Sequence, residues 1–231
     1  MKARYVYHSL NETYESFREL QSAVKIILES LEDLKGENPI PISSIFKEKD
    51  LSSFPTLKNF LSSNVGIIYD KEAKDSAFVF PSLGGKDEEG DRFQSKDWPW
   101  GVIVIKNERS ILHELQHAYD YFRSNRKMLS DKKIGKYSKL LDKREWDPED
   151  PEILKSYARL DTEKSAFLSD VINYLRNEVF GDREVDKLPD AKRAYLWFKM
   201  AYPAWDQLKT ADQKKLAKRF YVYWTKILKG D

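Results

Sequence analysis

The chain of 231 residues contains no cysteine, only three histidines and only three methionines. Without cysteine it forms no disulfide bond, holds no metal through a thiolate and uses no thiol in catalysis. No hydrophobic run approaches the length that a bilayer span requires. The first residues also lack the apolar core of a signal peptide. We therefore expect a cytoplasmic protein without a membrane span.

Neither sign of charge predominates, since the chain has 40 Lys and Arg and 38 Asp and Glu, for a net charge of +2. This balance does not favour a nucleic-acid partner. Hydrophobic residues make up 41% and aromatic residues 13% of the chain, which is typical of a folded protein. The length predicts one domain over 1–231, with a subdivision into 1–125 and 150–231 as the alternative.

Two of the three histidines lie in one short motif, His-Glu-Leu-Gln-His at 113–117. Four residues apart on a helix, His113 and His117 project from the same face about one turn apart. That spacing suits one zinc ion, which prefers roughly tetrahedral ligands. Glu114 is rotated off the ligand axis and can reach a water molecule at the metal. The motif therefore predicts a hydrolytic zinc site with Glu114 as the general base.

The sequence around the motif favours an amphipathic helix over residues 108–123. Apolar residues recur there at steps of three and four, and neither proline nor glycine interrupts them. Asn107 is a plausible N-cap, and the β-branched run from Val102 to Ile105 predicts a strand just before the helix. The remaining histidine, His8, lies in a polar stretch and is better interpreted as a surface residue.

A catalytic zinc ion usually takes a third protein ligand and leaves one position for water. A carboxylate is the best candidate here, and the pattern from Asp150 to Gly181 predicts a helix that carries several. Glu163 is the first choice because Ala166, one turn later, lets two helices approach closely. Asp161 is the second choice, and Asp170 is a further competitor.

The His-Glu-Leu-Gln-His motif at 113–117, followed by Glu-x-x-Ala at 163–166, resembles the zinc-binding motifs of the gluzincin branch of the zincin metallopeptidases. The resemblance implies a zincin-like fold, Zn2+ held by His113, His117 and Glu163, and Glu114 as general base. The string at 113–120 is also similar to the active-site helix of a mitochondrial ATP-synthase-assembly peptidase family. The longer metzincin pattern is absent. Gluzincins often carry an aspartate four residues after the third ligand, where this chain has Phe167.

Another carboxylate would then have to orient the ligand histidines, because a hydrogen-bonded carboxylate fixes the tautomer and the orientation of a metal-bound imidazole ring. Asp120, one turn after His117, is the candidate, and a solvent-exposed helix residue is the alternative. Asp161 is a competitor for this role.

The reaction class would be hydrolysis of peptide bonds in a protein or peptide substrate. Tyr157 is a candidate for stabilising the oxyanion, and a core tyrosine is the alternative. An extended substrate could add to an exposed strand edge, for which we expect Val102, Ile103 and Val104. The glycine-rich segment 82–97 is either a lid or a surface insertion.

Elsewhere the pattern predicts helices over 12–34, 190–200 and 204–229, with Pro203 between the last two. Segments 65–69 and 77–80 predict a hairpin, which with 102–105 gives about three strands. We therefore expect an α+β fold, mostly helical, with a small and mainly antiparallel sheet before the active-site helix.

Residues 190–231 contain ten Lys or Arg and four Asp, with aromatic residues between them. Such helices could bind nucleic acid or an anionic membrane surface. The alternative, which the helical spacing of the aromatic residues favours, is that they pack in a core. Two functions besides a zinc peptidase thus remain as hypotheses: a catalytically inactive zincin-like binding module and a nucleic-acid-binding protein.

Overall fold

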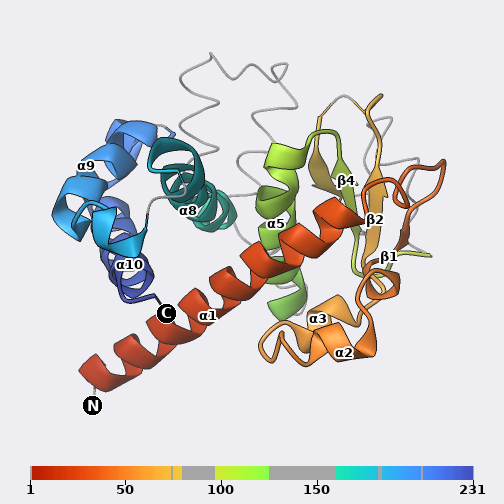
Figure 1. The fold of residues 1–231 in the computed structure, drawn as a ribbon, viewed down its shortest axis with the longest axis horizontal. Coiled ribbons are helices and arrows are strands. Elements are labelled where there is room, and N and C mark those ends of the chain that lie inside the picture. The colour runs from red at the N-terminus through yellow and green to blue at the C-terminus, as the bar shows by residue number, and fades with distance from the viewer. Residues whose placement is uncertain are drawn as a thin grey trace. The chain divides into compact units, whose positions relative to one another are not determined.

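The computed structural model describes residues 2–73, 75–79, 97–124, 160–181, 184–203 and 205–230. The chain divides into two compact units. One comprises Glu15–Met128, and the other combines Met1–Tyr14 with Leu129–Asp231. Helices and a small sheet make the fold α+β, as predicted (Figure 1). Within the described ranges, no helix is both long and apolar enough to cross a membrane.

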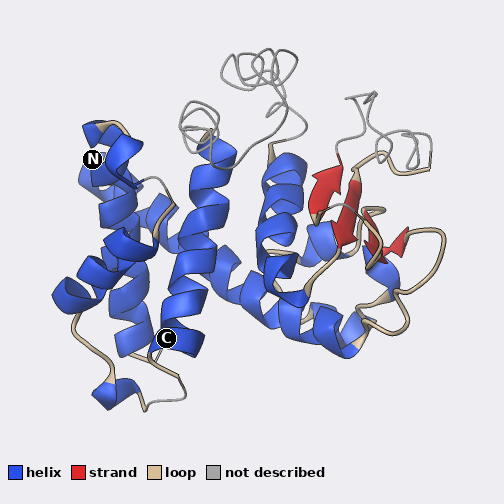
Figure 2. Ribbon diagram, turned by 90° about the horizontal axis from the view of Figure 1, so that it is seen from above, coloured by secondary structure: helices blue, strands red, loops and turns tan. Residues whose placement is uncertain are grey.

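The sheet belongs to the first unit and contains four described strands (Figure 2). They are β1 (Ile40–Pro41), β2 (Gly66–Tyr69), β3 (Ala77–Val79) and β4 (Val102–Ile105), in the order β1-β2-β4-β3. β2 and β4 are parallel, and the other two pairings are antiparallel. The predicted hairpin of 65–69 with 77–80 is wrong, because β4 lies between these two strands.

The central place of β4 follows from its composition. All four residues of β4 are β-branched and buried, and such a run suits a strand that is covered on both faces. Gly101 leads into it with φ 92°, and a Cβ at that position would lie 2.6 Å from the carbonyl oxygen of Val79. Only glycine accommodates both that backbone conformation and that close approach.

The expectation of a free edge at Val102, Ile103 and Val104 is therefore wrong. Each pairs with β2 on one side and with β3 on the other. Strand pairing on both sides engages the main-chain groups that an added peptide would need. These three residues support the core of the unit and do not offer an edge to a substrate.

Helix α5 (Ile111–Arg123) follows β4 directly and packs against it and β3. The ring of Tyr121 lies 5.7 Å from that of Phe78 on β3. On another side Tyr119 lies 5.6 Å from Phe60 of α3 (Lys58–Leu61). Apolar contacts with sheet and helices thus fix the position of α5.

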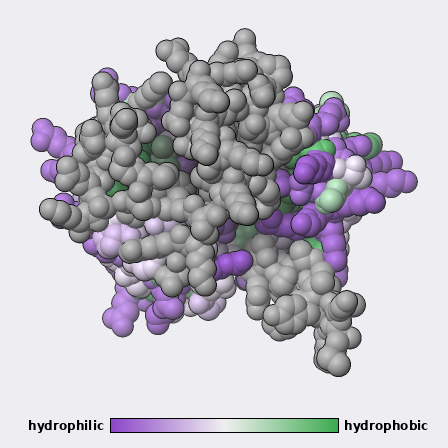
Figure 3. Space-filling view, turned by 180° about the vertical axis from the view of Figure 1, so that it is seen from behind, coloured by the Kyte–Doolittle hydropathy of each residue, from purple (hydrophilic) through white to green (hydrophobic). Residues whose placement is uncertain are grey.

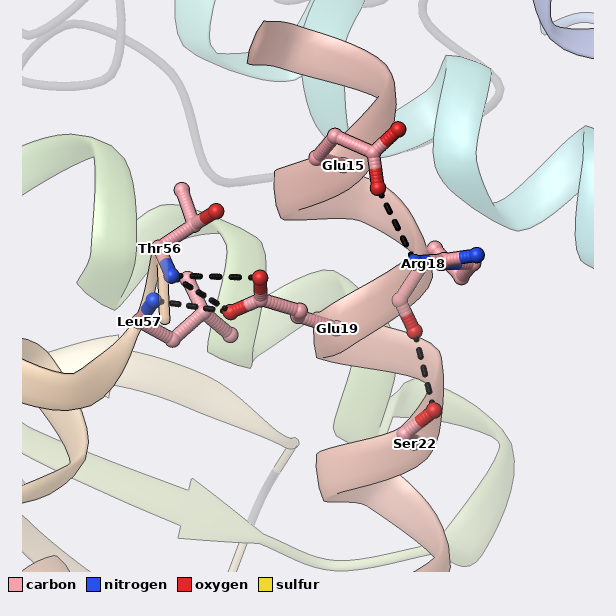
Figure 4. Close-up of polar contacts among 6 residues, drawn as sticks. All are labelled: Glu15, Arg18, Glu19, Ser22, Thr56 and Leu57. Carbon is pink, nitrogen blue, oxygen red and sulfur yellow. Dashed lines mark hydrogen bonds and ion pairs between the residues drawn. The ribbon is translucent and has the colours of Figure 1, made fainter. Parts of the chain in front are cut away.

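Helix α1 (Lys2–Glu29) begins earlier and ends earlier than the predicted 12–34. Its buried residues include Phe17, Leu20 and Ile27, whereas Leu28 is 36% exposed. The buried carboxylate of Glu19 accepts hydrogen bonds from the backbone N–H groups of Thr56 and Leu57, just before α3 (Figure 4). These bonds satisfy a buried charge and backbone donors at once.

Ser16 and Tyr119 join α1 to α5 through their hydroxyl groups, which lie 3.1 Å apart in a buried hydrogen bond. Two short elements complete this unit, a 3-10 turn (Ile42–Ser44) and α2 (Glu48–Leu51).

The second unit is helical in its described part. It contains α8 (Asp161–Tyr174) with a π turn after it (Leu175–Val179), then α9 (Ala191–Ala201) and α10 (Thr210–Leu228). The side chain of Asp190 caps α9, and Gly181 ends the preceding segment at φ 59°, both at predicted boundaries. The predicted uninterrupted helix from 150 is wrong, because Leu160 is extended and α8 begins after it.

An aromatic cluster forms the core of these helices. The ring of Phe220 stacks 4.6 Å from Phe198 and 5.7 Å from Trp224. The indole N–H of Trp224 donates to the carbonyl of Pro189 at 2.9 Å. Most aromatic residues of this segment are thus core residues, as the helical spacing indicated, whereas Trp197 and Tyr221 are exposed.

Candidate metal centre

The two motif histidines lie on α5, whose start is set by local sequence. Asn107 accepts a hydrogen bond from the backbone N–H of Ser110, so it acts as the predicted cap of a 3-10 turn (Glu108–Ser110) that continues into α5. The buried residues Leu112, Leu115 and Ala118 hold the helix against its neighbours. A rigid helix of this kind presents His113 and His117 in a defined orientation.

The imidazole rings of His113 and His117 face each other. Their Nε2 atoms lie 3.0 Å apart, with ring centroids at 4.6 Å and planes at 80°. Two nitrogens on a tetrahedral zinc ion, each bonded at about 2.0–2.1 Å, lie about 3.3 Å apart. The pair therefore has nearly the separation that one shared ion demands, and the same two atoms point at each other.

Burial increases along the motif. His113 is half-buried, whereas Glu114 and His117 are each only 7% exposed. Carboxylates are rarely buried unless hydrogen bonds, cations or metals compensate the loss of hydration. Glu114 is buried as deeply as Glu19 and Glu163, and it lies between the two histidines of the motif.

Glu163 lies in the first turn of α8 and is 6% exposed. Glu163 is the third member of the ligand set that the sequence predicts together with His113 and His117. Two imidazole nitrogens and one carboxylate oxygen are also the donor set of many catalytic zinc sites.

The residues next to Glu163 are held by α10. Lys164 forms an ion pair with Asp212 at 3.1 Å, and both side chains are largely buried, with exposures of 8% and 19%. The guanidinium of Arg219 donates to the hydroxyl of Ser165 at 3.2 Å. Two successive positions after Glu163 are thus tied to the same neighbouring helix, which restricts how the glutamate can move.

Tyr202 is a residue near Glu163 that the sequence did not single out. Its ring packs against Phe167, one turn after Glu163 on α8. Burial raises the pKa of the Tyr202 hydroxyl strongly; the charges of Glu163 and Asp212 raise it further and that of Arg219 opposes them. The hydroxyl therefore stays protonated and can act as a hydrogen-bond donor over the whole physiological range. No local pattern distinguishes it among thirteen tyrosines.

The other predicted residues have different positions. Asp120 is half-buried on α5, one turn after His117. Asp161 is the first residue of α8, and Asp170 lies on the same helix. Tyr157 and segment 82–96 fall outside the described residues.

Comparison of the chain with protein-family models, with curated proteins and with solved structures finds no match. The function is therefore inferred from the site itself.

Proposed function

We propose that this protein is a zinc-dependent metallopeptidase that hydrolyses peptide bonds. In this proposal His113, His117 and Glu163 hold the metal, and Glu114 is the general base. The observation that carries the proposal is the facing pair of motif imidazoles, with Nε2 atoms 3.0 Å apart, next to a buried glutamate in the motif. The resemblance of the motif to gluzincins supports the same reading.

The donor set fits zinc better than a hard cation. Imidazole nitrogens suit zinc and later transition metals, whereas magnesium and calcium prefer oxygen ligands alone. Ligand atoms on tetrahedral zinc lie about 3.3 Å apart, so the Nε2 atoms of His113 and His117, now 3.0 Å apart, need to separate by only about 0.3 Å to share an ion. Rotation within side-chain torsions provides movements of this size. When bound, zinc polarises a substrate carbonyl and lowers the pKa of its water.

Glu114 supplies the proton transfers. Its carboxylate accepts a proton from the attacking water as the carbon–oxygen bond forms, and it passes that proton to the amide nitrogen as the carbon–nitrogen bond breaks. Burial shields Glu114 from bulk water, which strengthens its electrostatic interactions with reacting groups. Asp120 remains our candidate for orienting a ligand histidine, with Asp161 as its competitor.

Two tyrosines are candidates for stabilising the negative oxygen that develops on the carbonyl. Tyr157 was predicted from its place before Glu163. Tyr202 is supported by its packing beside the Glu163 turn and by a hydroxyl that remains protonated. A donor held in place before the reaction stabilises developing charge without reorganisation.

The test is a comparison of single substitutions in the full chain. In Glu114→Gln we expect zinc to bind at one ion per chain while hydrolysis of a peptide library falls by about 10²–10⁴-fold. In His117→Ala we expect both zinc and hydrolysis to be lost. Glu108→Gln is the matched control, because Glu108 is an exposed glutamate just before α5.

Undiminished hydrolysis in Glu114→Gln would refute the mechanism. Stoichiometric zinc without turnover by the wild type on any peptide would support the inactive binding module in its place.

A further inference from the structure

Exposed apolar side chains gather on α9 and the helix beside it. Among the described residues six large hydrophobic side chains are exposed, and four of them lie on α9 and α10: Leu196 at 55%, Trp197 at 49%, Met200 at 80% and Tyr221 at 37%. In Figure 3 green atoms stand among purple ones on the side where these helices lie. We call Leu196, Trp197 and Met200 the α9 patch.

The α9 patch forms a second apolar face on a helix that already has one. Ala194 and Phe198 are fully buried and make the core-facing side. Leu196 and Met200 are one turn apart on the other side, and Trp197 is next to them. A surface helix needs a single apolar stripe to pack on its own core. The additional face is therefore not explained by the folding of the unit.

The patch borders a groove of about 710 Å³ at the C-terminal end of α9. Its lining combines patch residues with aromatic and charged ones, including Leu196, Lys199, Met200, Tyr202, Trp205 and Asp206. A concave surface of this composition suits a peptide segment that inserts apolar side chains and leaves its polar groups at the rim. A bilayer, in contrast, would contact the protruding side chains and leave the groove unused.

Positive charges outnumber negative ones in the segment that carries the patch. Of the four aspartates in 190–231, Asp190 caps α9 and Asp212 pairs with Lys164, so two are engaged within the unit. Ten Lys and Arg are present in the same segment. Lys192 and Arg193 are exposed one turn before Leu196 and Trp197, on the same face, and Arg193 also forms an exposed ion pair with Asp190 at 3.7 Å. The complement of this surface is a segment that is both acidic and apolar.

We propose that the α9 patch and its groove bind an acidic amphipathic segment of a partner protein. The apolar side chains of the partner pack on Leu196, Trp197 and Met200, and its carboxylates pair with Lys192 and Arg193. Nucleic acid is the poorer fit, because its bases stack on aromatic faces, and Trp197 is the only aromatic residue of the patch, beside the more exposed Leu196 and Met200. This interaction requires no metal ion and no hydrolysis of peptides, although Tyr202, which lines the groove, is also a candidate residue of the proposed active site.

The test uses a fluorescein-labelled peptide of about 16 residues, with Leu and Phe at i, i+3, i+4 and i+7 and Glu elsewhere. A scrambled peptide of the same composition is the reference. Fluorescence anisotropy is measured with full-length protein in the Glu114→Gln background, so that cleavage cannot remove the probe. We expect saturable binding that is at least about tenfold tighter for the amphipathic order, since apolar anchors dominate such interfaces.

The double variant Leu196→Glu, Met200→Glu should weaken binding by about tenfold or more, with an unchanged thermal midpoint because both side chains are exposed. Tyr174→Glu is the matched control, since Tyr174 is 50% exposed on α8. Charge reversal of Lys192 and Arg193 should weaken binding at low ionic strength and much less at high ionic strength.

Equal affinity for both peptides, or undiminished binding by the patch variant, would overturn the proposal. Parallel titrations with phosphatidylglycerol vesicles and with single-stranded RNA complete the test. If either is bound through the patch residues while the peptide is not, the surface serves a different partner and the proposal fails.

Discussion

Two helices carry the candidate ligands, and they are held by different kinds of contact. α5 is held by apolar and aromatic neighbours such as Leu115 and Tyr121, which are fully buried. The Glu163 turn of α8 is held by charged and polar contacts, namely the Lys164–Asp212 pair and the Arg219–Ser165 hydrogen bond. Apolar packing is tolerant of geometry in its individual contacts, whereas hydrogen bonds and ion pairs depend steeply on direction and distance.

This difference suggests a division of roles. The apolar surroundings of α5 supply stability and fix a histidine pair whose spacing the helix already sets. The polar surroundings of α8 supply orientation for a single carboxylate whose position no local repeat defines. Substitutions in the apolar surroundings of α5 should therefore lower stability most. Substitutions in the polar surroundings of α8 should lower stability less but metal affinity more.

The largest effect is expected for Leu115→Ala in α5. Leu115 has no exposed surface, and truncation of such a side chain costs about 2–5 kcal/mol. Urea denaturation followed by circular dichroism measures this change. Leu28→Ala, at an exposed position of α1, is the control and should change stability by less than about 0.5 kcal/mol. A small cost for Leu115→Ala would show that apolar packing does not dominate around α5.

Breaking the Lys164–Asp212 ion pair is expected to have the second-largest effect on stability. Lys164→Met removes the cation that pairs with Asp212. Breaking a fully buried ion pair in this way lowers the free energy of unfolding by about 3–5 kcal/mol. Because Asp212 is 19% exposed, we expect a smaller loss of about 2 kcal/mol. The double variant with Asp212→Leu should recover much of that stability. Zinc affinity should fall in Lys164→Met by more than in Leu115→Ala under conditions where both are folded. Equal zinc affinities would contradict the orienting role of the polar contacts.

Tyr202→Phe tests the same region through pH. Burial raises the folded-state pKa of Tyr202 above its usual value of 10.0. Above pH 10 the unfolded chain loses this proton and the folded chain keeps it, so stability falls as pH rises, by up to about 1.4 kcal/mol per pH unit. Between about pH 10 and 12, Tyr202→Phe should remove this contribution of up to about 1.4 kcal/mol per pH unit from the pH dependence of the free energy of unfolding. Below pH 9 the free energy of unfolding should stay nearly unchanged. Identical slopes in both proteins would show that the hydroxyl is not buried.

The smallest effect is expected for Ser16→Ala, which removes the buried hydrogen bond to Tyr119 between α1 and α5. A buried hydrogen bond of this kind contributes about 1 kcal/mol. Paired measurements with Tyr119→Phe and the double variant give the coupling energy. A coupling energy near zero would show that apolar contacts alone stabilise the packing of α1 on α5.

Local patterns predicted the helices well where one residue marks a boundary. Asn107 is the cap that the sequence predicted, Asp190 caps α9 at the predicted start of that helix, and Gly181 ends a helix with positive φ. The His113–His117 pair was also predictable, because helical spacing alone brings the two rings together. Each of these features depends on residues within four positions of one another.

The errors concern contacts between distant segments. β2 and β3 look like a hairpin in sequence, yet β4 pairs between them because its fully apolar composition favours the centre of the sheet. The role of β4 as a free edge fails for the same reason. Tyr202 could not be selected, because its relation to Glu163 arises from the packing of α9 and α10 on α8.

The most direct test is zinc titration of metal-free wild type, Glu163→Ala and His117→Ala, combined with X-ray absorption spectroscopy of the zinc complex. We predict one zinc ion per chain with two imidazole nitrogens and oxygen ligands, and a loss of affinity of about 10²-fold or more in each variant. Wild-type zinc affinity in Glu163→Ala, or a zinc spectrum with fewer than two imidazoles, would contradict the proposed centre.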